Sequence, residues 1–433
     1  MIKTIDYQID GINDAELDIK RNSKLEFKLT YDSTKEIRAL IAVIPGLGED
    51  GDTYYRDNLA HSIARDLDAA VITANYFGVK SNPPAAKFSI DEIDELILKT
   101  VAENIGNPIP DNIELTKMES EEIWDFVNEH LYNFIGMQKV TGKLRLDFKM
   151  PMHMTLTPPN GEYQNFGLMA ALDVVNSVLY IKNNPPFKLH PNCQNGHLAT
   201  IYVGSSHGGY IANLCAKFAP WAVDAVLDNC GWNLSTEIFD KKDYQPGTFR
   251  TIGFGKEIDF MKYRRDSRDN ENFHLCVSDK TFWTSNSQSP NYFSRSRYEI
   301  RDVNEPNHLK VLSNYPKPIF KCYHVKGDSV APIDEKIKFY EQLQANGFDA
   351  TLDIVSDKSR VDGKFIKNLS HGMDMSIKLL VANNYEWILN KIATNKRSKC
   401  EPVITLETSQ YTYEFSQKDN QVSLECKKNK AIK

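Results

Sequence analysis

Short apolar runs alternate with amphipathic stretches along most of the chain. The first two runs, at residues 39–44 and 69–76, are separated by a helix-like stretch, and four more follow at 199–203, 222–227, 319–325 and 350–355. Strands that are apolar on both faces and alternate with helices are typical of a parallel sheet with helical crossovers. The pattern therefore predicts an α/β fold with a mostly parallel central sheet flanked by helices.

The two ends of the chain follow a different pattern. Residues 1–37 alternate between apolar and polar positions, as in the stretch 24–30, which predicts an edge hairpin and so an N-terminal β extension of the sheet. Residues 395–433 begin and end rich in lysine and contain an alternating run at 411–415. This C-terminal extension is either a peripheral hairpin or a partly disordered tail.

Two long excursions interrupt the alternation of strands and helices. The first, residues 79–161, holds two amphipathic stretches and a segment rich in methionine and proline, which predicts an inserted helical excursion. The second, residues 231–314, is rich in aromatic and arginine side chains and is too long for a simple connection. The pattern thus predicts a core at 38–230 and 315–394, enlarged by these excursions and by the two ends.

Composition excludes several classes of protein. Of the 433 residues, 41% are hydrophobic, and 52 basic against 58 acidic residues leave a net charge of −6. Such a chain is expected to fold rather than to be disordered, and its charge gives no reason to expect a nucleic-acid partner. No apolar run has the length of a signal peptide or of a membrane span, so we expect a cytoplasmic protein without a membrane span.

The cysteines and histidines lack the spacing of metal sites. Seven cysteines are scattered without a Cys-x-x-Cys pair, which suits reduced and mostly buried thiols. The ten histidines show none of the short repeats that bind zinc. The sequence therefore predicts neither a bound metal nor a disulfide framework.

The most informative motif is Gly204-Ser-Ser206-His-Gly208, which lies between an apolar strand and an apolar helix. In that context Gly-x-Ser-x-Gly is typical of a nucleophile elbow, a sharp turn in which small residues on either side let strand and helix approach. A plain glycine-rich turn is the alternative explanation, but the motif seldom falls between a strand and a helix by chance. We therefore predict that Ser206 is a nucleophile.

A serine hydroxyl needs a base that a third group orients. Asp328 follows a predicted strand, and His371 comes after the next strand and before the last helix, so both are expected at the carboxyl edge of the sheet. The chain order Ser206, Asp328, His371 is the order of this class of site. Asp334 and Asp228 are rival candidates for the acid.

The transition state of acyl transfer places negative charge on the carbonyl oxygen, which requires preorganised N–H donors. The backbone N–H of His207, directly after the serine, is one candidate, and the N–H of Leu47 in the turn 45–48 is the other. The same turn opens a Gly-x-Gly-x-x-Gly pattern, but Glu49 and Asp50 would place two carboxylates beside a pyrophosphate. We therefore expect an oxyanion turn and no cofactor.

These motifs, in this order, resemble those of the α/β-hydrolase superfamily of serine hydrolases. More narrowly, the stretches 16–27 and 163–173 are similar to an uncharacterised bacterial hydrolase family of unknown function. The resemblance covers roughly residues 38–394 outside the two excursions, and it implies an α/β-hydrolase fold with a serine nucleophile. The chain has Pro45-Gly46 where the commoner oxyanion turn has His-Gly.

The resemblance also implies that residues 231–314 form a cap, because in this fold the segment before the acid-bearing strand commonly covers the active site. The aromatic residues of the cap form either a small core or a pocket lining. Its arginines are either solvated or bind a carboxylate or phosphate of the substrate. The candidates for that binding are Arg264, Arg265 and Arg268.

The leading hypothesis is hydrolysis of an ester or thioester through an acyl-Ser206 intermediate. The substrate is then a small-molecule or carrier-bound acyl compound, and an anionic one, such as an acidic sugar ester or an acyl-coenzyme A, is the extension of this hypothesis. Two alternatives stay open, an acyltransferase that uses the same residues and a catalytically idle binding protein on the hydrolase fold.

Overall fold

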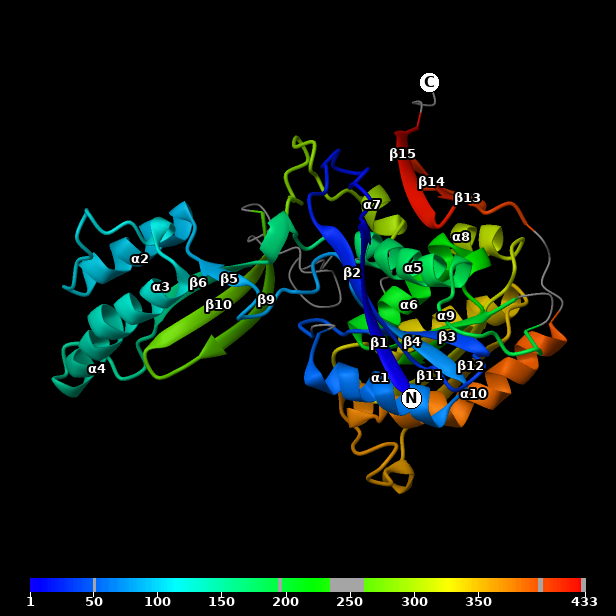
Figure 1. Ribbon diagram of the computed structural model, residues 1–433. Helices are drawn as coiled ribbons and strands as arrows, with labels where there is room; N and C mark the ends of the chain where they lie inside the picture. Colours follow the sequence, from blue (N-terminus) through cyan, green and yellow to red (C-terminus); the bar gives the residue numbers. More distant parts are fainter. Residues whose placement is uncertain (50–51, 194–196, 234–260, 396–399, 430–433) are drawn as a thin grey trace. The chain divides into compact units, whose positions relative to one another are not determined.

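The computed structural model describes residues 1–49, 52–193, 197–233, 261–395 and 400–429 (Figure 1). These residues form two compact units. The first unit comprises residues 1–79, 165–244 and 293–433, and the second comprises residues 80–164 and 245–292.

The first unit contains an eight-stranded sheet in the order β1-β2-β4-β3-β7-β8-β11-β12. β1 and β2 form an antiparallel hairpin, β2 pairs antiparallel with β4, and from β4 onward all neighbours are parallel. The edge hairpin and the mostly parallel sheet of an α/β-hydrolase fold are therefore confirmed. The strands are β1 Ile2–Asp10, β2 Lys24–Asp32, β3 Ala39–Ile44, β4 Ala69–Asn75, β7 Ala199–Ser205, β8 Ala225–Asn229, β11 Ile319–Val325 and β12 Ala350–Val355.

Helices cover both faces of this sheet (Figure 1). α1 and α10 pack on one face, where their apolar side chains join Ile41, Val43 and Val203 in one core, and α5 and α6 lie on the other. β3 is buried along its whole length because successive side chains of a strand reach both covered faces. The helices of this unit are α1 Tyr54–Asp66, α5 Leu168–Asn183, α6 His207–Phe218, α7 Arg295–Glu299, α8 Pro306–Leu312, α9 Ile333–Ala345 and α10 Ile377–Thr394.

The C-terminal extension forms a separate antiparallel sheet of β13 Val403–Glu407, β14 Tyr411–Lys418 and β15 Gln421–Lys428. The Asn176 side chain of α5 bonds both backbone groups of Val422, at 2.7 and 3.2 Å, and Phe415 stacks on Phe218 with ring centroids 4.5 Å apart. Of the two alternatives for this segment, the described part adopts the ordered one, with three strands rather than two.

The second unit has its own sheet, in the order β5-β6-β10-β9, with β6 and β10 parallel. Helices cover the sheet, and a core forms around Met150, Met152 and Met154 with Leu98 and Ile135. The segment rich in methionine and proline is therefore a strand with its methionines buried. The elements are β5 Lys87–Ser89, α2 Glu92–Asn104, α3 Ser120–Phe126, α4 Asn133–Val140, β6 Met150–Thr157, β9 Lys262–Asp269 and β10 Phe273–Lys280.

The second unit combines parts of the two excursions that the sequence predicted as separate. The expected insertion at 79–161 and the expected cap at 231–314 share one sheet, because β6 of the former pairs with β10 of the latter. Residues 293–314 belong to the first unit instead, and residues 234–260 of the expected cap lie outside the described ranges. Across those ranges, no helix combines the length and the apolar character needed to cross a membrane.

Candidate active site

Ser206 occupies the turn between β7 and α6 in a backbone conformation that is rare for a serine. Its φ is 55° and its ψ is −122°. A Cβ on Gly204 would lie 2.1 Å from the carbonyl carbon of Gly208, and a Cβ on Gly208 would lie 2.4 Å from the Ile44 oxygen. Both glycines are thus required for the close approach of strand and helix. The turn is the sharp elbow that the motif predicted.

The loops after β11 and β12 bring the other two predicted residues to this turn. The Ser206 hydroxyl donates to His371 Nε2 across 2.8 Å, and His371 Nδ1–H donates to Asp328 Oδ2, also across 2.8 Å. The His371 side chain is 22% exposed. With its Nδ1 proton held by a carboxylate, the imidazole keeps Nε2 as an acceptor facing the hydroxyl.

Asp328 is fixed by its own loop. Its Oδ1 accepts the N–H groups of Val330 and Ala331, each across 2.8 Å. Burial alone would raise the pKa of Asp328, but hydrogen bonds from His371 and from Ala331 N–H outweigh burial and hold that pKa below its usual value. The carboxylate is therefore charged near neutral pH and able to stabilise an imidazolium.

Asp228, a rival acid, has other partners. Its carboxylate pairs with the buried Lys336 ammonium across 2.7 Å and accepts hydrogen bonds from Gly231 N–H and the Asn213 side chain. These contacts tie β8 to α6 and α9 beneath the elbow. The other rival, Asp334, lies in the first turn of α9.

The backbone N–H groups of the two predicted oxyanion donors form no hydrogen bond with the residues that the structure describes. His207 is the first residue of α6, where a backbone N–H has no partner within the helix. Leu47 N–H donates to no described residue, whereas Gly46 N–H donates to Glu49 Oε2 across 2.9 Å. A Cβ on Gly208 would lie 2.9 Å from Pro45 O, so the turn lies against the elbow.

Two residues that no sequence motif marked, Asn229 and Tyr76, tie these segments together. Asn229, the last residue of β8, donates from Nδ2 to Ser205 Oγ across 3.0 Å and to Gly372 O across 2.9 Å. Asn229 O also accepts the N–H of Ser206 across 2.9 Å. One residue therefore joins the elbow to the loop that carries the histidine.

Tyr76 joins the predicted oxyanion turn, residues 45–48, to the start of α6. Its hydroxyl donates to Pro45 O across 3.0 Å and lies 3.4 Å from His207 Nδ1. Burial lowers the pKa of His207 to about 4, so its ring is neutral at pH 7. One sequence feature could have pointed to Asn229 and Tyr76. Each is a polar side chain at the carboxyl end of a buried strand, and ligands bind at that edge of α/β sheets.

The arginines proposed for substrate binding lie on β9 of the second unit. Arg265 pairs with the buried Asp279 across 3.2 Å and donates to Ser81 O across 2.8 Å. The structure thus gives Arg265 a structural partner, and substrate binding by Arg264 and Arg268 stays a prediction. In the first unit, Arg301 of the same arginine-rich stretch forms a fully buried pair with Glu16.

One group of metal-ligand side chains lies near the site within the described part of the chain. Ligand atoms of Cys230, His324 and Asp328 lie within 4.8 Å of one another, and all three residues are buried. His324 Nε2–H donates to Ala331 O across 2.8 Å, and Asp328 already accepts three hydrogen bonds. His324 Nε2 and both oxygens of Asp328 are thus already used to hold the geometry of the acid, which fits a metal poorly.

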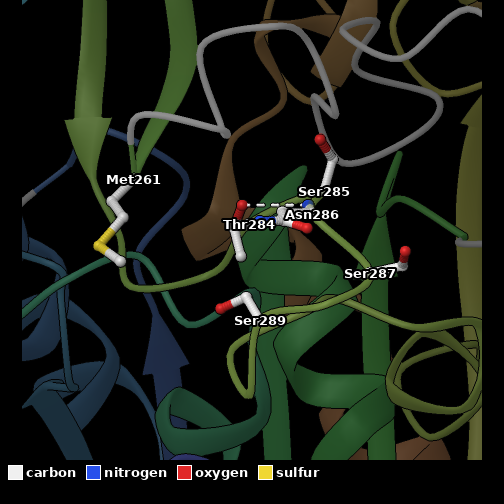
Figure 2. Close-up of a pocket in the computed structure, with 6 residues that line it drawn as sticks. All are labelled: Met261, Thr284, Ser285, Asn286, Ser287 and Ser289. Carbon is white, nitrogen blue, oxygen red and sulfur yellow. Dashed lines mark hydrogen bonds between the residues drawn. The ribbon is translucent and has the colours of Figure 1, made fainter.

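Each unit contains a cavity. A cavity of about 500 Å³ in the first unit is lined by His371 and Ser205, among others. The one in the second unit, about 610 Å³, is lined by Met261 and by five hydroxyl or amide residues, Thr284, Ser285, Asn286, Ser287 and Ser289 (Figure 2). Among the described residues that line this second cavity, none has an acidic or basic side chain, whereas His371 lines the cavity of the first unit.

Several solved structures resemble this chain, with low identity. A brefeldin A esterase, described as a bacterial homologue of human hormone-sensitive lipase, is 11% identical with a TM-score of 0.41, covering 90% of this chain and 75% of that one. Dienelactone hydrolase from Anabaena variabilis is 12% identical with a TM-score of 0.36, covering 90% and 98%. Est1E from Butyrivibrio proteoclasticus is 12% identical with a TM-score of 0.40, covering 86% and 96%. Likeness at this level carries no argument about function.

Comparison with families gives a match along most of the sequence. The model of the family described as "Protein of unknown function (DUF2920)" matches residues 5–426. No curated protein matches the chain.

Proposed function

The chain belongs to the DUF2920 family of proteins of unknown function, and we propose that it is a serine hydrolase that cleaves an ester or thioester through an acyl-Ser206 intermediate. The observation that carries the proposal is the continuous line of hydrogen bonds from Ser206 through His371 to Asp328, with the serine in a strained elbow. A serine held in this way has both a base within reach and a conformation that exposes its oxygen.

In the first half of the reaction, Ser206 Oγ attacks the carbonyl carbon of the substrate while His371 Nε2 takes the hydroxyl proton. The charge that develops on the carbonyl oxygen is stabilised by the N–H groups of Leu47 and His207. The tetrahedral intermediate collapses, the bond to the leaving oxygen or sulfur breaks, and the imidazolium gives its proton to the leaving group. Asp328 stabilises the imidazolium throughout.

In the second half, water replaces the leaving group. His371 Nε2 takes a proton from the water, whose oxygen attacks the acyl carbon, and the proton then goes to Ser206 Oγ as the acyl bond breaks. The products are a carboxylic acid and the free enzyme. An acceptor alcohol, amine or thiol in place of water would make the same site an acyltransferase.

Labelling with a fluorophosphonate probe tests the nucleophile. We expect one adduct per native chain by intact mass and none on Ser206→Ala. Ser205→Ala is the matched control, because it removes the neighbouring hydroxyl and leaves the nucleophile, so its adduct should persist. Labelling that survives in Ser206→Ala contradicts the assignment.

A second measurement separates hydrolysis from transfer. The chain is mixed with 4-nitrophenyl butyrate or butyryl-coenzyme A, and the acyl-enzyme is followed by intact mass. Turnover in water alone supports a hydrolase. A trapped acyl-enzyme that only an added acceptor discharges would instead make the protein an acyltransferase.

A further inference from the structure

The cavity of about 500 Å³ in the first unit borders three segments of the proposed active site, namely the turn after β3, the elbow and the histidine loop, although its described lining includes neither Ser206 nor Asp328. Its lining includes Glu49 beside the oxyanion turn, Gly204 and Ser205 of the elbow, and His371 itself with Gly372. The volume falls within the range of about 300 to 1,000 Å³ that is usual for small-molecule sites. A ligand in this space therefore lies next to the proposed general base.

The buried part of the lining is apolar. Val43 at the end of β3, Val203 on β7, and Met375 and Ile377 after the histidine are all buried. The ring of Tyr55, which also lines the cavity, is 57% exposed and adds an apolar face nearer to solvent. Such surfaces favour the hydrocarbon or ring portion of a ligand.

The charged part of the lining has three cations and two carboxylates. Arg56 pairs with Glu49, and because Glu49 also holds the oxyanion turn, this pair is committed to the fold. Lys367 pairs loosely with Asp374, across 3.4 Å, and both side chains are exposed. Lys364 makes no side-chain hydrogen bond or ion pair with any residue that the structure describes. Lys364 and Lys367 therefore present positive charge that is available to a ligand.

We propose that this cavity is a substrate subsite in which Lys364 and Lys367 bind an anionic group, a carboxylate or a phosphate, while the apolar part of the substrate lies on the buried lining. This inference rests on the proposed function, because it assigns the cavity to the same serine centre. Ammonium groups pair with either anion as point charges, so the two lysines select for negative charge. The favoured substrate is an ester or thioester with an apolar portion and an anionic end.

The first test compares matched esters on the native chain and on the double variant Lys364→Gln/Lys367→Gln. 4-Nitrophenyl butyrate is the neutral ester, its ω-carboxylate analogue is the second, and its ω-phosphate analogue distinguishes the two anions. We expect KM to rise about ten-fold for an anionic ester and less than about two-fold for the neutral one, because each exposed ion pair contributes a factor of a few. Equal changes for neutral and anionic esters would overturn the subsite.

The second test measures binding without turnover, on chains that also carry Ser206→Ala. Hexanoate and hexyl phosphate are titrated by calorimetry, with hexanol as the uncharged control. We expect the double lysine variant to weaken binding of at least one anion about ten-fold, and added salt to weaken it in the chain that retains both lysines. Lys358→Gln, an exposed lysine of the same loop outside the cavity lining, is the matched control and should leave binding unchanged.

The two proposals fail in different ways. If neither anion binds, or if binding is the same in all variants, the subsite is wrong even when Ser206 is labelled by the fluorophosphonate. If an anion binds through the lysines but Ser206 is not labelled, the anion site stands and the hydrolase is wrong.

Discussion

The serine, histidine and aspartate at the elbow have a counterpart in the second unit. There, His153 Nε2 lies 2.6 Å from Ser278 Oγ, and His153 Nδ1 lies 3.6 Å from Asp94 Oδ1. The same three residue types stand in the same sequence of contacts in both places. Their surroundings differ in access, in backbone and in charge.

Ser278 is fully buried within strand β10, whereas Ser206 is half-buried in a turn with positive φ. Asp94 pairs with the buried ammonium of Lys262, whereas Asp328 has no lysine or arginine partner in the part of the chain that the structure describes. A carboxylate already neutralised by lysine stabilises an imidazolium weakly, and a buried hydroxyl meets no substrate. On these grounds we expect nucleophilic chemistry at Ser206 and none at Ser278, although the same three types of side chain are in contact in both places.

The largest expected difference is between the two serines. Ser206→Ala should lower kcat by about 10⁶-fold, because the nucleophile is lost, whereas Ser278→Ala should leave kcat within about two-fold. Ester hydrolysis by both purified variants measures this. A comparable loss in Ser278→Ala would show that the second cluster takes part in catalysis.

Substitution of the two aspartates should have different effects, with Asp328 affecting activity and Asp94 affecting stability. Asp328→Asn should lower kcat by about 10⁴-fold, because the amide no longer holds the histidine in the required tautomer. Asp94→Asn should leave kcat nearly unchanged and destabilise the protein by about 2 kcal/mol, because a buried lysine loses part of its compensation. Kinetics and thermal unfolding on both variants test the pair, and similar kinetic losses would contradict the contrast.

The buried ring of His207 predicts a pH dependence of stability at the elbow. Its pKa is about 4 in the folded chain and about 6.5 when unfolded. Between these two pH values only the unfolded state binds the proton. The free energy of unfolding therefore falls by about 3 kcal/mol as the pH falls from 6.5 to 4. His207→Gln keeps the backbone N–H and removes this contribution, so its unfolding free energy should fall less with acid. Parallel pH curves of native and variant chains would contradict the prediction.

The smallest expected effect concerns the link between elbow and histidine loop. Asn229→Ala removes the hydrogen bonds to Ser205 and Gly372, so kcat should fall about ten-fold with KM within about two-fold, because the base is less well positioned. Asn384→Ala is the control, since it removes a buried amide whose hydrogen bond, to Leu380 O, lies within α10. A matching kcat loss in both variants would make the effect one of stability alone.

The two stretches that resemble the uncharacterised family, residues 16–27 and 163–173, form buried ion pairs that stabilise the fold. Glu16 forms a fully buried pair with Arg301, and Arg21 pairs with Asp173 across 2.7 Å in the interior. Asp173 also accepts the Phe77 N–H across 2.8 Å. These contacts fasten the segment after β1 to α5 and to the chain after α7. The similarity in these stretches thus reflects packing rather than chemistry at the serine.

Local pattern was sufficient for much of the fold and of the candidate site. Strand and helix periodicity act within a few residues, so the hairpin and the parallel sheet were readable from the chain. The elbow glycines report a contact between adjacent elements, and the order of Ser206, Asp328 and His371 follows from the connectivity of the sheet. The sequence points to Leu47 as the second oxyanion donor because the turn after β3 must meet the elbow.

Contacts between distant segments were decided by the tertiary structure alone. The pairing of β6 with β10 joins two excursions that look independent in sequence, because strand pairing leaves no local signal of its partner. Arg265, one of the three arginines predicted to bind substrate, instead pairs with the buried Asp279. Asn229 and the lysine-bearing cavity emerged only once the loops were brought together. The sequence determined which side chains could react, and packing determined which of them are accessible, paired or free.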